Sequence, residues 1–509
     1  MPPLVPQVEY TQRPAFRLVI GALLGALIFQ TGYLLVASIL FVLVIGVLLL
    51  YPFKKIDREL IIWTLLIAIA FGLYSQLRAI PFGLVAHPQT LFHAKIKLLH
   101  PIIASAESQV QYQAKVELPS GQWINVQLRV PSPETIPEAD SYGTEGVATL
   151  DLSPLSSIKN KGYRRYLISQ GINAQATIQS IASLTPMKRK PLISQLQAWR
   201  YHLRQRFDAL SAPQISWQSR GLIYALSLGD RSLLPTSLKQ QFSHTGVAHI
   251  LALSGYHLGV VMWLFSLLIG RILWRYEWRQ LRYLLLLSLL IAYTLFSGAS
   301  TATVRALLMS VIVIAGKLLA RPIDPIQLLS LVFVIFLAIN PFSYYSLGLL
   351  LSLSAVWGIF SFYPLFIRCL NPTNRFLQWL RDLICLTISA QIGVLPLLLL
   401  NFGSAPLVFI WSNIPLLFLS SLLIPLALLC FLLTALLGWV PNALLQFLNL
   451  LAEWMHAVTN LFSPNPINLT IRFDWVALIL YYLIAYLAYR LFHSYTCRLE
   501  AQRLIHPDD

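Results

Sequence analysis

The sequence is poor in charged residues. Asp, Glu, Lys and Arg make up 11% of its 509 residues, whereas a soluble domain carries roughly 25%. Hydrophobic residues make up 57%, and the mean hydropathy is +0.67. This composition excludes a soluble globular protein and predicts a chain with several membrane spans. The formal net charge of +17 is less informative, because Lys and Arg accumulate in the cytoplasmic loops of any membrane protein.

Cysteine and phosphate-binding motifs are also scarce. The four cysteines lie in or beside apolar segments without metal-ligand spacing, so they predict neither a disulfide framework nor a metal site. The sequence has no GxxxxGK[ST] loop, so we expect any ATP-driven force to come from another protein. The first apolar run lacks a small-residue cleavage site, and we expect it to anchor the chain.

Three membrane spans are expected before residue 78. Residues 15–51 are apolar apart from a break at 30–32. This run is too long for one span of roughly 20 residues, so it predicts a helical hairpin. Residues 60–77 predict a third span. Basic residues such as Arg17 and Lys54 then fall on one side, which places the N-terminus in the cytoplasm and the following segment outside.

Residues 78–187 are predicted to form a small β-rich domain. Residues 111–130 alternate apolar and polar side chains around a Pro-Ser-Gly turn, which predicts a hairpin, and 145–153 and 172–181 predict further strands. Between Arg78 and Arg220 there are sixteen Lys and Arg against eight Asp and Glu. A polyanion partner would explain this excess, and so would a solvated surface or anionic lipid headgroups.

Residues 188–210 carry an apolar stripe at helical spacing, with arginines off the stripe. A basic amphipathic helix on the bilayer surface is one interpretation. A ramp that guides phosphates toward the membrane domain is the other. The stripe consists of Leu192, Leu196, Trp199, Leu203 and Phe207, and the arginines are Arg200, Arg204 and Arg206.

Apolar segments follow one another closely from residue 247 onward. Loops rich in Lys and Arg alternate along the chain with loops that are not, and the positive-inside rule then places both termini in the cytoplasm. Residues 442–462 are amphipathic and are expected to lie at the membrane interface. The expected spans are 247–270, 283–297, 303–319, 326–340, 344–362, 383–400, 406–424, 425–440 and 475–492.

The stretch 221–263 carries polar side chains into an expected membrane helix. His249, Ser254 and His257 need partners in hydrocarbon, so such groups usually face a bundle interior or a water-filled path. The histidine spacing does not fit a zinc motif, and no acidic ligand is near in the sequence. Ser254 and His257 lie three residues apart and can hydrogen-bond. A hydrolase dyad would also need an oxyanion hole and usually an orienting carboxylate.

Other positions in apolar segments favour a polar path as well. Gly255 and Gly259 lie four apart and are expected to offer a flat face for close helix packing. Arg305 either snorkels to the interface or faces a path where it can contact phosphates. Gln391 and Asn413 lie in spans that prolines interrupt, and broken helices with polar side chains are tolerated where they line a cavity.

Four segments together carry a resemblance to a known family. They are LGDRSLL with FSHTGVAHILALSGYHLGVV (228–261), FSGASTATVRALLMS (296–310), NPFSYYSLGLLLSLSAVWGI (340–359) and ISAQIGVLPLLLLNFGSAP with NIPL (388–416). They resemble, in the same order, the ComEC family of bacterial DNA-internalisation competence proteins. KNKGYRRYLISQGI (159–172) resembles a loop and short helix of the family's extracytoplasmic domain, which is OB-like.

The resemblance implies an inner-membrane channel for uptake of single-stranded DNA during natural transformation, with no catalytic activity, cofactor or metal of its own. It also implies a periplasmic DNA receptor, a cytoplasmic ATPase or single-strand-binding protein, and a possible homo-oligomer. Many members continue into a metallo-β-lactamase-like domain that these residues do not include. The alternative from the residues is an intramembrane hydrolase or small-solute transporter that uses Ser254, His257 and Arg305.

The predicted architecture is a multi-pass α-helical membrane protein with about twelve spans and a small β-rich OB-like extracytoplasmic domain. The expected order is N-terminal membrane helices (1–77), OB-like domain (78–187), basic amphipathic helix and linker (188–218), competence-type membrane domain (219–493) and cytoplasmic tail (494–509). The expected DNA-path residues are Asp230, Arg231, His249, Ser254, Gly255, His257, Gly259, Arg305, Gln391 and Asn413. The expected DNA-collecting residues are Lys159, Lys161, Arg164, Arg165, Arg200 and Arg204.

Overall fold

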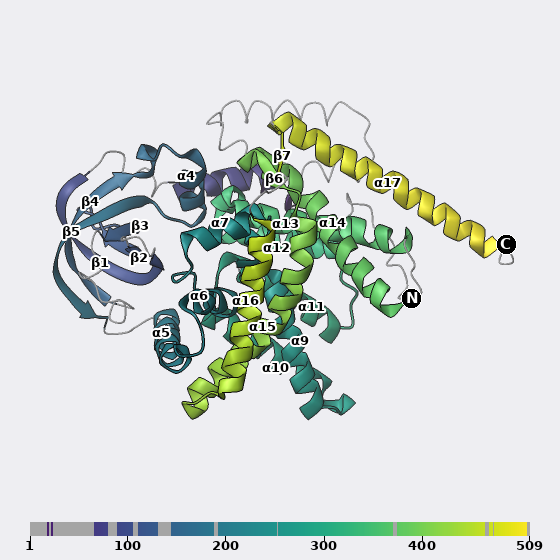
Figure 1. The fold of residues 1–509 in the computed structure, drawn as a ribbon. Helices are drawn as coiled ribbons and strands as arrows, with labels where there is room; N and C mark the ends of the chain where they lie inside the picture. The colour runs from purple at the N-terminus through teal and green to yellow at the C-terminus, as the bar shows by residue number, and fades with distance from the viewer. Residues whose placement is uncertain are drawn as a thin grey trace, which may run out of the picture. The chain divides into compact units, whose positions relative to one another are not determined.

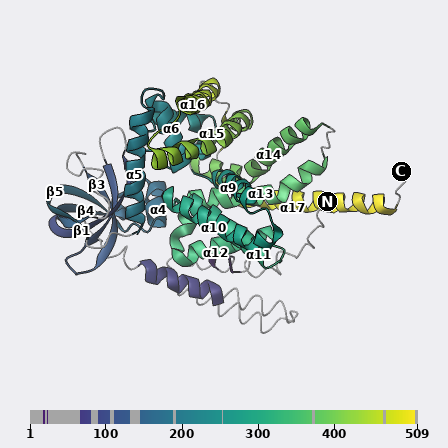
Figure 2. The same ribbon diagram turned by 90° about the horizontal axis from the view of Figure 1, so that it is seen from below.

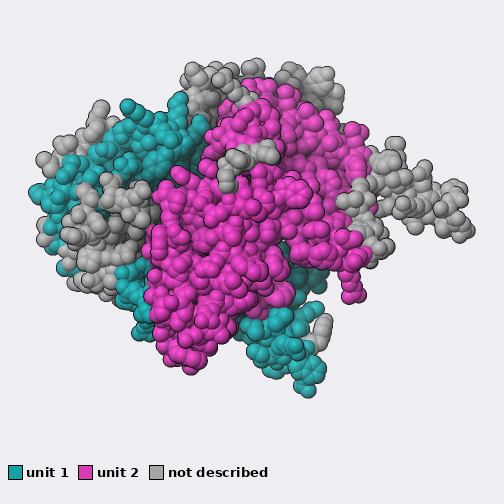
Figure 3. Space-filling model, in the orientation of Figure 1, with its two compact units in different colours: residues 1–209, 265–347 teal, residues 210–264, 348–509 magenta. Residues whose placement is uncertain are grey.

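The residues described by this computed structural model group into two compact units (Figure 3). Unit 1 contains residues 1–209 and 265–347, and unit 2 contains residues 210–264 and 348–509. The predicted hairpin at 15–51 lies outside the described residues, apart from positions 18–19 and 22–23. The described ranges are 18–19, 22–23, 66–79, 89–104, 110–130, 144–187, 192–251, 253–369, 374–463, 468–471 and 473–505.

A closed five-stranded β-barrel forms the first part of unit 1 (Figures 1 and 2). The strand order is β1-β2-β3-β5-β4, and β1 pairs with β4 to close the barrel. All neighbours are antiparallel except β3 and β5, which run parallel. The strands are β1 (Gln89–Ala104), β2 (Val110–Glu117), β3 (Trp123–Val130), β4 (Thr144–Pro154) and β5 (Ala174–Pro186).

The barrel core follows from the alternation of apolar and polar residues along its strands. On β3, Ile124, Val126 and Leu128 are at most 1% exposed. Gly121 has φ +78° and supplies the tight turn between β2 and β3. The predicted hairpin is therefore confirmed, and β4 and β5 confirm the other two predicted strands. Strand β1 was not predicted, although residues 93–98 carry the same alternation, with three buried core positions.

Helix α4 (Lys161–Ser169) connects β4 to β5 and is fixed at both ends. The Asn160 side chain caps it by accepting the backbone N–H of Tyr163 at 3.1 Å. Leu167 is fully buried within a small cluster beside the barrel. Beyond the helix, the Asn125 side chain of β3 donates to the carbonyl of Gly171 at 3.2 Å. The predicted short helix in this segment is thus confirmed.

The other helices of unit 1 are apolar and pack in sequence order, α10 on α11 and α11 on α12. The Tyr74 hydroxyl donates to the carbonyl of Ala338 at 2.7 Å, which ties the helix Leu66–Ala79 to the end of α12. The elements are α5 (Leu192–Ser211), α10 (Arg279–Phe296), α11 (Thr301–Leu318), α12 (Pro325–Ile339) and the 3-10 turn η5 (Pro341–Tyr345).

Unit 2 contains most of the remaining helices. In it α15 packs on α6, α14 and α16, while α17 packs on α14. The helices are α6 (Trp217–Leu228), α7 (Thr236–His244), α8 (Ala248–Leu251), α9 (Gly255–Ile272), α13 (Leu347–Cys369), α14 (Arg375–Phe402), α15 (Phe409–Leu437), α16 (Asn442–Phe462) and α17 (Trp475–Ile505). The last residues of α9 and the first of α13 are assigned to unit 1.

Seven helices among the described residues are long and apolar enough to cross a membrane: α9, α10, α11, α13, α14, α15 and α17. Two shorter apolar helices are Leu66–Ala79 and α12. The chain is therefore a multi-pass helical membrane protein. One prediction is wrong: the segments 406–424 and 425–440 are not two spans but one helix, α15, which continues through Pro415 and Pro425.

Helices α15 and α16 form a hairpin, so the segment that follows α16 lies beside the segment that precedes α15. Strand β6 (Ser404–Pro406), just before α15, pairs antiparallel with β7 (Asn468–Thr470), which follows α16. The amphipathic helix predicted at 442–462 exists as α16, and its apolar face packs against α15 and α6. The end of α14 and the start of α17 consequently lie at the same level of unit 2.

Candidate nucleic-acid path

The loop after α6 in unit 2 carries the first predicted path residues. Gly229 ends α6 in the left-handed conformation, with φ +72°. The Asp230 carboxylate then accepts the backbone N–H of Ser232 at 3.0 Å, which fixes the turn. Burial and the nearby positive charge of Arg231 lower the pKa of Lys239 on α7. Two cations therefore lie close together on this side of unit 2.

The turn between α7 and α8 is held against the start of α15. Gly246 has φ +76°, and a Cβ there would lie 2.8 Å from Phe409 Cβ, so the turn requires glycine. The Ser412 hydroxyl donates to the carbonyl of Thr245 at 2.9 Å. As a result His249, which is solvent-accessible on α8, lies beside the Asn413 side chain.

Ser254 and His257 form the N-terminal cap of α9. Nδ1 of His257 accepts the backbone N–H of Ser254 at 3.1 Å and lies 2.8 Å from its hydroxyl. In a capping box, the side chain of the third helical residue bonds to the backbone N–H of the N-cap residue. His257 and Ser254 have this geometry. The proton of the neutral imidazole is assigned to Nε2 by this network. Nε2 is buried and has no hydrogen-bond partner among the described residues.

Polar side chains of α14 and α15 meet beside this cap. The Asn413 amide donates to the Thr387 hydroxyl at 3.2 Å, and the Asn413 side chain also lies within hydrogen-bonding range of His249. Gln391 lies one helical turn after Thr387 and is half-buried. His257 lies within electrostatic range of His249 and Arg231. The structure thus brings the predicted residues His249, His257 and Asn413 together with Thr387 into one polar set in unit 2.

The close helix crossing lies at glycines that the sequence analysis did not single out. A Cβ at Gly358 would overlap the carbonyl oxygen of Ser389, and a Cβ at Gly393 would overlap that of Ser354. Each helix carries a small-xxx-small pair there, which was the available signal. A Cβ at Gly259 would meet no atom within 4 Å. The predicted close packing at Gly259 is therefore wrong for the described residues, and Gly255 is exposed.

Helix α17 stabilises a proline site in α14. Pro396 has no N–H, so the carbonyl of Ile392, four residues earlier, loses its helical partner. The Tyr481 hydroxyl donates to this carbonyl at 3.0 Å, and the Tyr482 hydroxyl donates to the carbonyl of Gly393 at 2.8 Å. These two bonds act next to the α13–α14 crossing and fix the segment that follows Gln391.

Arg305 belongs to unit 1, on α11. Its side chain is 4% exposed, so it does not snorkel to a surface. Helix α5 approaches the turn before α11: a Cβ at Gly298 would lie 2.8 Å from Nη1 of Arg200. The Trp199 ring contacts Phe296 at 5.2 Å between centroids and is 53% exposed, whereas Leu203 and Phe207 of the same stripe are buried.

The predicted collecting residues of α4 lie at the end of α12. Arg165 is exposed, with its guanidinium carbon 5.6 Å from the centre of the Tyr345 ring in η5. The Asn340 side chain donates to the carbonyl of Ser169 at 2.8 Å, and α4 packs on η5. Lys159 and Lys161 are exposed as well. These cations therefore stand where the barrel meets helices of unit 1.

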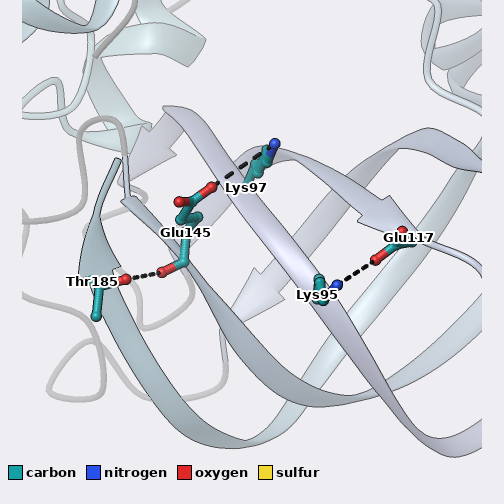
Figure 4. Close-up of polar contacts among 5 residues, drawn as sticks. All are labelled: Lys95, Lys97, Glu117, Glu145 and Thr185. Atoms are coloured by element: carbon teal, nitrogen blue, oxygen red, sulfur yellow. Dashed lines mark hydrogen bonds and ion pairs between the residues drawn. The ribbon is translucent and has the colours of Figure 1, made fainter. Parts of the chain in front are cut away.

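The β1 face of the barrel has a different charge pattern (Figure 4). Lys95 pairs with Glu117 at 3.6 Å, and Lys97 pairs with Glu145 at 3.8 Å. Thr185 donates to the backbone carbonyl of Glu145 at 3.2 Å. These carboxylates compensate the lysines of β1. In contrast, residues 155–173, which include α4, contain no Asp or Glu.

The described residues contain no group of three His, Cys, Asp or Glu side chains that would suit a metal ion. The polar set belongs to unit 2 and Arg305 belongs to unit 1. The polar set offers hydrogen-bond donors and acceptors with a nearby cation, Arg231, which suit a hydrated polar or anionic ligand.

The fold and the site define the class of this protein. It is a multi-pass membrane protein with polar side chains buried among its helices. Residues 226–494, more than half of the chain, match the family model described as Competence protein. The chain therefore belongs to the competence protein (ComEC) family.

Two curated proteins are similar to part of this chain. ComE operon protein 3 of Bacillus subtilis (strain 168) is 25% identical over 313 residues, which is 61% of this chain and 38% of the relative. Recombination protein 2 of Haemophilus influenzae is 26% identical over 347 residues, 64% of this chain and 41% of the relative. The matched part of the chain thus spans about two fifths of the length of these relatives. No solved structure matches the chain.

Proposed function

We propose that this protein is an inner-membrane channel that passes single-stranded DNA into the cytoplasm during natural transformation, without catalytic activity of its own. The observation that carries the proposal is the polar set of His249, His257, Thr387 and Asn413 within the residues that match the competence family. Nε2 of His257 is buried without a hydrogen-bond partner among the described residues, and such a group in a membrane bundle costs free energy unless it faces water or a polar ligand. A hydrated strand is such a ligand.

The barrel of unit 1 is the collecting module in this proposal, an OB-like domain on the periplasmic side. The contacts of α4, α5 and the helix 66–79 support this orientation. They involve η5, the turn before α11 and the end of α12, which the basic-loop pattern places outside. The level set by β6 and β7 is consistent with both termini in the cytoplasm.

Partners must supply what the residues do not. A periplasmic DNA receptor would deliver the strand, and a cytoplasmic ATPase, a single-strand-binding protein or the proton gradient would draw it inward. A homo-oligomer would be needed if one bundle is too narrow for the strand.

The decisive experiment follows labelled DNA into the cytoplasm of a deletion strain and of the complemented strain. We expect protected single-stranded label in the cytoplasm only after complementation. Label that enters equally in both strains would overturn the proposal. Purified full chain should also bind single strands with an affinity that falls steeply with salt, because Lys and Arg release condensed counterions.

An intramembrane hydrolase is the second candidate, because the Ser254 hydroxyl lies 2.8 Å from Nδ1 of His257. The same nitrogen accepts the backbone N–H of Ser254, so the contact already has a capping role. Nε2 has no carboxylate partner among the described residues, whereas a hydrolytic histidine is oriented by one. The geometry therefore favours the channel, and Ser254→Ala separates the two.

A further inference from the structure

The outer face of α4 combines aromatic rings with cations that form no ion pair among the described residues. Tyr163 and Tyr166 stack one turn apart, with ring centroids 6.4 Å apart and ring planes 21° from parallel. The Tyr163 hydroxyl donates to Oε1 of Gln127 in β3 at 2.8 Å, and Gln127 is buried. The inner ring is thus fixed to the barrel wall, and it holds the outer ring at a set angle.

Tyr166 is the exposed member of this pair, at 47%. Arg165, the residue before it, contacts Tyr345, which lies 4.3 Å from Tyr344 between ring centroids. Because Asn340 holds α4 onto η5, the rings and cations keep their spacing. A rigid exposed ring with cations around it is the arrangement on which an unpaired base stacks while its phosphates are neutralised.

We infer that Tyr166 is a base-stacking subsite for single-stranded nucleic acid, at the point where the barrel meets η5. The inference rests on the proposed function and adds to it a reason for selecting single strands. Bases in a duplex already stack on each other, so a side-chain ring gains contact only with an unpaired base.

The chemistry of α4 argues against a lipid headgroup as the occupant. A helix that inserts into an interface exposes an apolar face beside its cations. On α4 the two aliphatic residues, Leu167 and Ile168, are buried and half-buried in the cluster beside the barrel. The exposed positions include Lys161, Arg165 and Tyr166. The face offers one ring and several charges, which fits a base and its phosphates.

The test compares two strands of equal charge on the full chain in nanodiscs of neutral lipid. One is a 20-nucleotide oligothymidylate, and the other has the same phosphates with abasic sites. We expect the chain to prefer the oligothymidylate, and Tyr166→Leu to lower that affinity roughly tenfold while leaving the abasic strand unchanged. Tyr166→Phe should keep the preference, because the ring remains. Arg164→Gln should weaken both strands alike.

Trp123→Leu is the matched control. Trp123 is also an exposed ring on the barrel, at 39%, but its face is covered by Lys97 at 4.7 Å, beside the Lys–Glu pairs of β1. The Trp123→Leu variant should therefore bind both strands with unchanged affinity. Equal affinity of the parent chain for both strands, or an unchanged preference in Tyr166→Leu, would overturn the subsite and leave the channel intact. No binding of either strand would overturn both proposals.

A lipid contact has its own readout. A solvent-sensitive dye on Gly162→Cys should respond to oligothymidylate and not to replacing neutral by anionic nanodisc lipid. The reverse response would assign α4 to the membrane surface and overturn the subsite.

Discussion

At the scale of single residues, hydrogen-bond geometry assigns Ser254 a capping role. Its backbone N–H and hydroxyl both lie within bonding distance of one imidazole nitrogen. A nucleophile would be indispensable, whereas a cap contributes stability alone.

Ser254→Ala is therefore expected to keep DNA uptake within about twofold and to lower the free energy of unfolding by about 0.5–1.5 kcal/mol, because it removes one hydroxyl–imidazole hydrogen bond and keeps the backbone N–H that His257 accepts. Uptake per membrane-inserted molecule and the thermal midpoint in detergent measure the two effects. Abolished uptake by a normally inserted variant would favour the hydrolase instead.

The glycine crossing gives a second residue-scale prediction. Gly393→Leu should destabilise unit 2 by about 1–3 kcal/mol or more, because its side chain meets the backbone of Ser354. Gly259→Leu is the matched control, since a Cβ there meets open space. Thermal midpoints and membrane abundance compare the two. A tolerated change at Gly393 together with a severe one at Gly259 would reverse the packing assignment.

At the scale of elements, α17 supplies a hydrogen bond that Pro396 removes from α14. Proline within a helix leaves a carbonyl without its partner, and a neighbouring helix can supply a donor. Tyr481 does this for Ile392, so α17 contributes to the shape of the helix that carries Gln391.

A double-mutant cycle tests this relation. Tyr481→Phe should cost about 1 kcal/mol in the parent chain and much less with Pro396→Ala, where a backbone N–H again reaches Ile392. Tyr283→Phe on α10, whose hydroxyl has no recorded bond among the described residues, should cost nothing in either background. Equal costs of Tyr481→Phe in both backgrounds would mean that the tyrosine does not serve the proline site.

At the scale of the whole molecule, the hairpin of α15 and α16 preserves the predicted sidedness. Two spans were expected at 406–440, and one long helix is found there, yet β6 and β7 return the chain to the same level. Because β6 and β7 pair, α17 begins beside the start of α15, so the side on which α17 is expected to begin is unchanged.

Cysteine accessibility tests that sidedness in a chain without its four native cysteines. An impermeant maleimide added to spheroplasts should label Ser156→Cys on the barrel and Asn468→Cys on β7, both exposed. It should label Gln280→Cys at the start of α10 only after lysis. Labelling of Asn468→Cys only after lysis would mean that α15 and α16 change sides.

The sequence by itself determined the class of the protein and the identity of its local elements. Low charge and long apolar runs require a membrane, and alternation around Gly121 requires a hairpin, because both signals depend on neighbours along the chain. The run of motifs also indicated the family, which the match over residues 226–494 established.

Tertiary structure alone decided which of these residues meet. The Gly358–Gly393 crossing, the bond from Tyr481 to Ile392 and the placement of α4 on η5 join positions far apart in the sequence, and each depends on backbone approach rather than on residue type. The same reason explains the error at Gly259. A glycine permits close approach, but only a second helix in the right place makes use of it.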